Sequence, residues 1–110
     1  MENRRQFIRL TQPLDGHYRG QSGALSCRIM DISWGGCFIE TLSTPSRGEQ
    51  TVVTVPVRDT NIEIDGCVVY VDRGMGFAVR FDPLTAANVE ALKELLGDPP
   101  PSVVAGAKAD

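Results

Sequence analysis

Short apolar runs with strand-like alternation make up most of the chain. They cover residues 23–32, 37–42, 51–57, 62–71 and 75–81, and a weaker run covers 16–18. Turn residues separate the runs at intervals of roughly ten residues, as at 35–36 and 72–74, and this spacing is typical of a small all-β barrel or sandwich. We therefore expect a mainly-β domain in which Gly66 marks a bulge or bend and Pro56 marks a sheet edge or a strand end.

One helix is predicted after the last strand. Apolar residues recur at helical spacing from Val89 to Leu96, and Gly97 ends the run. Asp82 is suited to the N-cap and Pro83 to the first helical position. We expect the apolar stripe of this helix to close one end or side of the barrel. The alternative is a membrane-surface helix, which is disfavoured because the polar face is not basic.

The two ends of the chain differ in composition from its middle. Residues 1–9 are charged and have no apolar periodicity, so they are expected to form a flexible N-terminal arginine arm. Residues 98–110, which include three consecutive prolines, are expected to form a flexible tail outside the fold. The barrel and its closing helix are then expected to span residues 10–97.

Length, composition and charge narrow the class of protein. The 110 residues are 42% hydrophobic and 23% charged, which is ordinary for one globular domain. No apolar run approaches the ~20 residues that span a bilayer, and the N-terminus lacks the apolar stretch of a secretory signal, so we expect a cytoplasmic protein without membrane insertion. The net charge of −3 disfavours DNA and RNA as partners. Three of the nine arginines nevertheless lie in the first nine positions, which points to a small anionic partner.

Candidate catalytic and metal-binding groups are few. Cys27, Cys37 and Cys67 are odd in number and not at C-x-x-C spacing, so we interpret them as small buried apolar residues and not as a disulfide framework or zinc site. The single histidine, His17, has no partner pattern, and no Ser-His-Asp order, Walker loop or nucleophile elbow is present. We therefore expect no enzyme activity, no metal and no cofactor.

Two short motifs carry groups suited to binding a nucleotide. Arg5 and Arg9 are four positions apart, which places them on one side of either a helix or a strand, and arginine binds phosphate bidentately and stacks on purines. Asp31 and Ser33 point to one face of a predicted strand, where a carboxylate can accept hydrogen bonds from guanine. Each motif alone has an ordinary alternative interpretation. The first could be a solvated arginine pair, and the second could be a glycine turn stabilised by Asp and Ser side chains.

Together the motifs resemble the PilZ domain family. R-x-x-x-R at the N-terminus, D-x-S-x-x-G at residues 31–36 and the later segment GCVVYVDRGMGFAVRFDPLT follow the order seen in the family, and the resemblance covers residues 2–97. It implies a six-stranded antiparallel β-barrel with one C-terminal helix and, as ligand, the bacterial second messenger cyclic di-GMP. The ligand-binding residues that it implies are Arg4, Arg5, Arg9, Asp31, Ser33, Gly35 and Gly36.

The resemblance also implies a function in second-messenger signalling. We expect a single-domain receptor in which the ligand draws Arg5 and Arg9 onto the barrel beside Asp31 and Ser33 and so changes the surface shown to an unidentified effector protein. The alternative is a PilZ-like protein-interaction adaptor that binds no nucleotide. A binder of single-stranded nucleic acid is disfavoured by the acidic charge and the few aromatic residues. Arg4 is compatible with binding of a stacked ligand dimer.

Three residues near the motifs have open roles. Trp34, the only tryptophan, is expected either to lie exposed near the ligand or to anchor the turn in the core. Arg73 and Arg80 could add positive charge to the site, although nothing in their spacing requires it.

Overall fold

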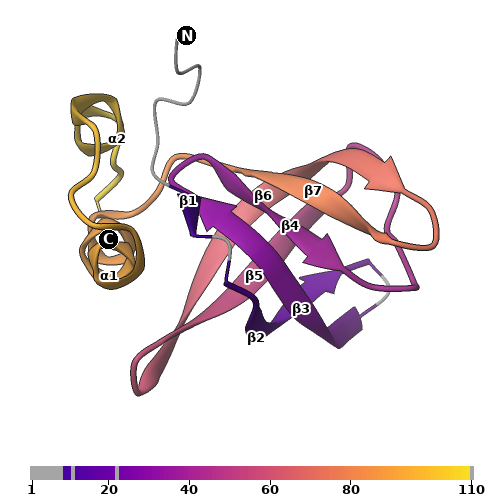
Figure 1. Ribbon diagram of the computed structural model, residues 1–110. Coiled ribbons are helices and arrows are strands. Elements are labelled where there is room, and N and C mark those ends of the chain that lie inside the picture. The colour runs from indigo at the N-terminus through magenta and orange to yellow at the C-terminus, as the bar shows by residue number, and fades with distance from the viewer. Residues whose placement is uncertain (1–8, 11, 22, 110) are drawn as a thin grey trace, which may run out of the picture.

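The computed structural model describes residues 9–10, 12–21 and 23–109, which form seven strands and two helices (Figure 1). These elements are β1 (Arg9–Leu10), β2 (Leu14–Gly20), β3 (Gly23–Ser33), β4 (Gly36–Glu40), β5 (Gln50–Val57), β6 (Thr60–Asp72), β7 (Gly76–Phe81), α1 (Ala86–Leu96) and α2 (Pro101–Ala105). Strands were expected at each of the six apolar runs, and each run coincides with one of the strands β2–β7.

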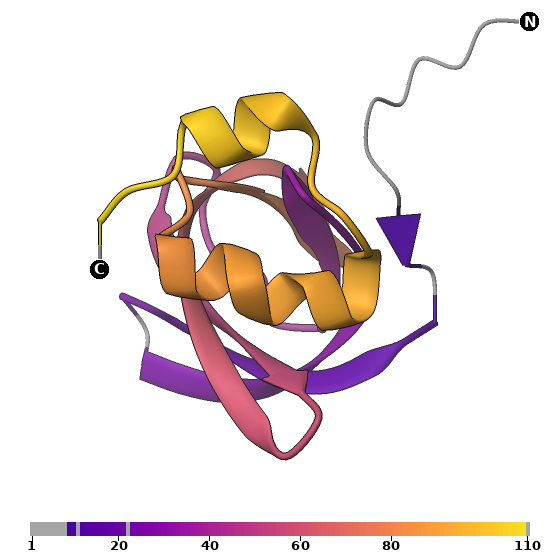
Figure 2. The same cartoon turned by 90° about the vertical axis from the view of Figure 1, so that its left-hand side faces the viewer.

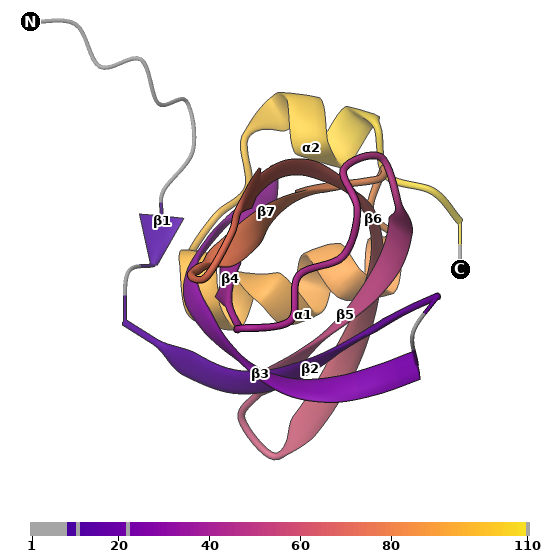
Figure 3. The same cartoon turned by 90° about the vertical axis from the view of Figure 1, so that its right-hand side faces the viewer.

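The strands close into a barrel. They pair antiparallel in the order β3-β2-β5-β6-β7-β4, and β4 pairs back with β3 (Figure 3). The two-residue strand β1 adds to one edge of β3, where Leu10 is opposite Ile32. Ile32 is also paired with Cys37 of β4, so β1 must lie on the other edge of β3, in line with β2. The predicted six-stranded antiparallel barrel is confirmed, with β1 as a short extension.

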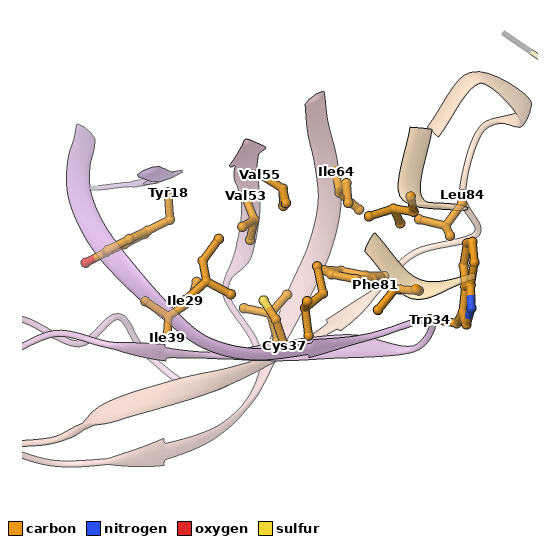
Figure 4. Packing of buried hydrophobic residues seen from close by; sticks show 14 of the residues in the cluster. Tyr18, Ile29, Trp34, Cys37, Ile39, Val53, Val55, Ile64, Phe81 and Leu84 are labelled. Carbon is orange, nitrogen blue, oxygen red and sulfur yellow. The ribbon is translucent and has the colours of Figure 1, made fainter. Parts of the chain in front are cut away.

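Alternating side chains fill the barrel. Along β5, the buried positions are Thr51, Val53, Val55 and Val57, while the residues between them are partly exposed, as expected of a strand with one buried face. The aromatic ring of Tyr18 packs edge-on against another buried ring, that of Phe77, at a centroid distance of 5.0 Å. Figure 4 shows that the apolar core continues from Tyr18 at one end to Trp34 and Leu84 at the other.

Helix α1 lies across one open end of the barrel (Figure 2). It buries Val89, Leu92 and Leu96 against the core, as the helical spacing predicted. Its C-cap is Gly97, which has the positive φ of 79° that glycine tolerates without strain.

The predicted start of this helix is wrong. The N-cap is Thr85, whose hydroxyl accepts a hydrogen bond from the backbone N–H of Asn88 at 3.1 Å. Asp82 instead accepts a hydrogen bond from Gln50 at 2.7 Å. Between them, Leu84 is buried in the core, so the chain must run extended until its side chain is packed and only then turn into the helix.

The C-terminal segment differs from the predicted tail outside the fold. Residues 101–105 form α2, and Pro101 stands at the start of this helix, where its missing N–H is tolerated. Val103 and Ala107 pack against the core. Lys108 then forms a parallel bridge beside the start of α1, donating its N–H to the carbonyl of Leu84 at 2.8 Å and accepting from the N–H of Ala86 at 2.9 Å.

The two strand irregularities expected from the sequence had different outcomes. Pro56 lies beyond the part of β5 that pairs with β2, and therefore near a strand end as expected. The irregularity in β6 lies between Val68 and Tyr70, whereas Gly66, the predicted bulge, pairs regularly with Phe81. In the described ranges, neither helix is long and apolar enough to cross a membrane.

Candidate functional site

The turn between β3 and β4 carries the D-x-S-x-x-G motif and is stabilised by Ser33. The Ser33 hydroxyl accepts a hydrogen bond from the backbone N–H of Gly35 at 3.3 Å and donates one to the carbonyl of Gly36 at 3.4 Å. The residue is 8% exposed. A hydroxyl has one donor and two acceptor positions, so Ser33 can hold the turn and still accept one further hydrogen bond from a ligand.

A hollow of about 460 Å³ lies on the outer surface beside this turn. We call it the Asp31 hollow. It is lined by Asp31, Ser33, Gly35, Gly36, Cys37, Phe38, Val69, Ala78, Val79 and Arg80. Four of the seven residues implied by the family resemblance therefore surround one depression of the size that small-molecule ligands occupy. Asp31, partly exposed, supplies a carboxylate to this depression, and Phe38 and Ala78 contribute apolar surface.

The last residue of the first motif, Arg9, lies beside the second motif in the sheet. The backbone of Arg9 is paired with Ser33, the central residue of the second motif. Arg9 and Ser33 are therefore far apart in the sequence and adjacent in the sheet. Arg4 and Arg5, the other two arginines predicted to bind the ligand, lie outside the described residues.

Arg80 is a site residue that the sequence alone did not select. It is exposed, lies on β7 between the buried Val79 and Phe81, and is paired with Gly36 across the β4–β7 ladder. Strand alternation predicts that Arg80 points outward, but only the pairing of β7 with β4 brings it to the hollow. It therefore places a guanidinium group on the same depression as the Asp31 carboxylate.

Gly36 is required by the close approach of two strands. A Cβ atom at this position would collide with the backbone carbonyl oxygen of Val79 and would lie 3.3 Å from the Cα of Arg80. Glycine therefore lets β4 and β7 pair at the floor of the hollow.

Trp34 anchors the turn in the core. Its side chain is 2% exposed and lies beside Phe81 and Leu84 (Figure 4). Of the two roles considered for Trp34, the structure shows the anchoring one. His17 is exposed on β2, and Arg73 lies away from the Asp31 hollow, against a depression near the β6–β7 turn.

Burial protects two of the cysteine thiols, those of Cys27 and Cys37. Burial raises the pKa of Cys27 from 9.0 to about 11 and raises that of the fully buried Cys37 still further. Cys27, Cys37 and Cys67 are free thiols. Across the described part of the chain, no group of three or more His, Cys, Asp or Glu side chains is arranged to hold a metal ion.

Solved structures share the fold at low sequence identity. The Bacillus subtilis inhibitor of motility, MotI/DgrA, matches with a TM-score of 0.71 and 18% identity over 83% of this chain and 48% of that chain, so the present chain spans about half its length. The PilZ domain of YcgR from Escherichia coli, solved with c-di-GMP, matches with a TM-score of 0.70 and 14% identity over 86% and 89% of the two chains. The PilZ domain of CeSA from a cellulose-synthesising bacterium gives 0.54 and 12% over 66% and 78%.

The sequence comparisons are consistent with this fold. No curated protein sequence matches the chain. The profile of the PilZ domain matches residues 3–98, which include the described barrel, α1 and both motifs. The chain therefore belongs to the PilZ domain family.

Proposed function

We propose that this protein is a cyclic di-GMP receptor that regulates a partner protein by changing its own surface when the ligand binds. PilZ domains are non-catalytic receptors that typically bind this dinucleotide. The observation that supports the proposal is that Arg9, the last residue of the first motif, is paired beside the second motif. Asp31, Ser33 and Gly36 line one hollow, and the backbone of Arg9 is paired with Ser33 at its edge.

The chemistry of the hollow fits a guanine nucleotide. The Asp31 carboxylate can accept hydrogen bonds from the N1–H and N2–H groups of guanine, which adenine does not present in the same way. Arg80 can pair with a phosphate or with the O6/N7 edge of guanine. Phe38 and Ala78 offer apolar surface to the flat face of a base. The two phosphates would be bound by Arg5 and Arg9, as the family motif implies.

The conformational response follows from where the arginines lie in the chain. Arg4 and Arg5 precede β1, whereas Arg9, Asp31 and Arg80 belong to strands of the sheet. A dianion that contacts both groups would hold the segment before β1 against the barrel and create a composite surface of ligand and protein. That surface is what an effector protein would recognise. A stacked ligand dimer would involve Arg4 as well.

Calorimetric titration with cyclic di-GMP tests the proposal. We expect saturable binding that cyclic di-AMP does not reproduce, and each of Asp31→Ala and Arg9→Ala should weaken it at least tenfold, because a hydrogen bond to a charged group contributes about 1.5–3 kcal/mol. The matched control is Asp59→Ala, which removes an exposed carboxylate in the β5–β6 turn. This variant should bind cyclic di-GMP as tightly as the natural chain. A Glu63→Ala variant, which changes another exposed carboxylate, should also bind normally.

Three results would count against parts of the proposal. Unchanged affinity in both Asp31→Ala and Arg9→Ala would remove the two-motif site. No binding and no thermal shift at high ligand concentration would leave the adaptor that binds no nucleotide, since a ligand at 100 times its dissociation constant adds about 2.7 kcal/mol of stability. A stoichiometry of one ligand per chain would exclude the stacked dimer.

A further inference from the structure

The end of the barrel opposite α1 carries a second open hollow. The segment 41–49, between β4 and β5, crosses this end (Figure 3), and the β6–β7 turn stands beside it. The hollow between them has a volume of about 620 Å³, and we call it the Arg47 hollow. Its lining includes the apolar residues Leu42, Pro45 and Val71 and two arginines, Arg47 and Arg73. The proposed nucleotide site uses none of these residues.

The Arg47 hollow is positively charged, although the protein as a whole has a net charge of −3. Arg47 and Arg73 are both exposed, and within the described ranges neither of them forms an ion pair. None of the described residues that line the hollow is acidic. Two guanidinium groups on one depression are complementary to carboxylates, which arginine binds bidentately.

The only carboxylate of the segment 41–49 is already engaged by backbone groups. The Glu49 carboxylate accepts hydrogen bonds from the N–H of Ser46 at 3.2 Å and from the N–H of Gln21 at 2.9 Å. These bonds hold the segment 41–49 to the turn between β2 and β3. Glu49 therefore leaves the charge of Arg47 available to a partner.

Further hydrogen bonds to the barrel fix the backbone of the segment 41–49. The buried Tyr18, which stands at this end of the core in Figure 4, donates its hydroxyl to the carbonyl of Ser43 at 2.7 Å. The N–H of Gly48 donates to the carbonyl of Val68 at 2.7 Å. A surface whose backbone is fixed in advance loses little conformational entropy when a partner docks on it.

The hollow also presents apolar surface to solvent. Leu42 is 88% exposed, and Met75, which follows the β6–β7 turn, is 53% exposed. A single exposed leucine is ordinary, but here it shares one hollow with two arginines that have no ion-pair partner among the described residues. Arginine and methionine are enriched at protein–protein interfaces. A matching occupant would carry an apolar side chain flanked by carboxylates.

We propose that the Arg47 hollow is a docking site for an acidic segment of a partner protein. Carboxylates of that segment pair with Arg47 and Arg73, and an apolar side chain between them packs on Leu42. The fixed backbone of the segment 41–49 presents these three side chains together.

The position of the hollow connects it with the proposed function. Val69 lines the Asp31 hollow and Val71 lines the Arg47 hollow, and the two valines are two residues apart on β6, or about 7 Å. A partner docked at the Arg47 hollow can therefore also contact a ligand in the Asp31 hollow. That this partner is the effector rests on the proposed function, whereas the docking itself does not.

A nuclear magnetic resonance titration of the full chain, without cyclic di-GMP, tests the docking. The probe is a synthetic peptide in which a leucine is flanked on each side by two glutamates. We expect saturable shifts of backbone amide signals confined to residues 41–49 and 71–75. The Arg47→Gln/Arg73→Gln variant should bind the peptide about tenfold more weakly, because both charge-assisted pairs are lost, and Leu42→Ser should bind it severalfold more weakly. The three side chains are exposed, so these variants should keep the melting temperature of the natural chain.

The matched control is the Arg19→Gln/Arg58→Gln variant. It removes the same charge from two exposed arginines that already pair with Glu63 and Glu94. It should bind the peptide as tightly as the natural chain does. Equal weakening in the two double variants would overturn the proposal, because net charge and not the hollow would then attract the peptide.

The other outcomes separate the docking from the ligand site. No saturable shift with millimolar peptide, or shifts that lie outside the hollow, would overturn the proposal. Inorganic phosphate that binds as tightly as the peptide would also overturn it, since the arginines would then accept any small anion. If the peptide binds while the natural chain does not bind cyclic di-GMP, the proposed function fails and the docking stands. Binding of cyclic di-GMP without binding of the peptide has the opposite meaning.

Discussion

Replacing Gly36 with alanine is a direct test of how the site is built. The new Cβ would collide with the Val79 carbonyl oxygen and would lie 3.2 Å from the Val79 carbonyl carbon and 3.3 Å from the Cα of Arg80. All three atoms belong to the backbone of β7, so no side-chain rotation relieves the contact. The β4 and β7 backbones must move apart at the pair that joins Gly36 to Arg80.

The magnitude follows from this geometry. Overpacking that forces a backbone shift typically costs about 1–3 kcal/mol. Alanine in place of glycine would by itself stabilise the protein by about 0.4–1 kcal/mol, by restricting the unfolded chain. The difference between these ranges is a net loss of about 0–2.6 kcal/mol, centred near 1.3 kcal/mol. At about 4 °C per kcal/mol for a domain of this size, the centre of this range lowers the melting temperature by about 5 °C.

Thermal and urea unfolding measure this effect, with Gly106→Ala as control. At Gly106, an exposed residue after α2, a Cβ would meet only the Ser102 carbonyl oxygen at 3.3 Å, so the change in stability should stay within about 0.5 kcal/mol. If Gly36→Ala were as stable as Gly106→Ala, the close approach of β4 and β7 would not be the reason for glycine in the motif. Displacement of Arg80 should also weaken ligand binding in the Gly36→Ala variant.

Two further predictions concern stability. Thr85→Ala should destabilise the protein by about 0.5–2 kcal/mol in urea unfolding because α1 loses its N-cap, whereas Thr85→Ser should retain it; equal losses in both would contradict the capping role. The raised pKa of Cys27, about 11, predicts a contribution to stability that is complete below pH 9 and lost as pH rises towards 11, since the unfolded chain releases the thiol proton first. A Cys27→Ala variant should show a smaller decline over that pH range; an identical decline would refute this.

Local patterns were sufficient to predict the elements of the barrel. Side chains in a strand alternate between two faces, and so the alternation along β5 indicated its buried side before any partner strand was known. The helical spacing that ends at Gly97 predicted the face of α1 in the same way. The start of α1 was missed, because Leu84 has to reach the core before the chain can turn at Thr85, and that requirement is tertiary.

The candidate site was only partly visible in the sequence. Asp31, Ser33 and Gly36 lie close together in the chain, so one motif could identify them. Arg80 could not be assigned in this way, since its place at the hollow depends on the pairing of β7 with β4. The segment after Gly97 was also misjudged, because consecutive prolines suggest a free tail, whereas Val103 and Ala107 find apolar partners on the closed barrel.

The sequence by itself determined which residues form strands, which face of each strand is apolar and which short motifs carry charge, because these properties depend on neighbours a few positions apart. Only the tertiary structure decided which outward faces meet around the Asp31 hollow, that Trp34 is buried, and that β1 pairs Arg9 with Ser33. The physical reason is that strand register and barrel closure are set by contacts between distant residues, and no local pattern specifies those contacts.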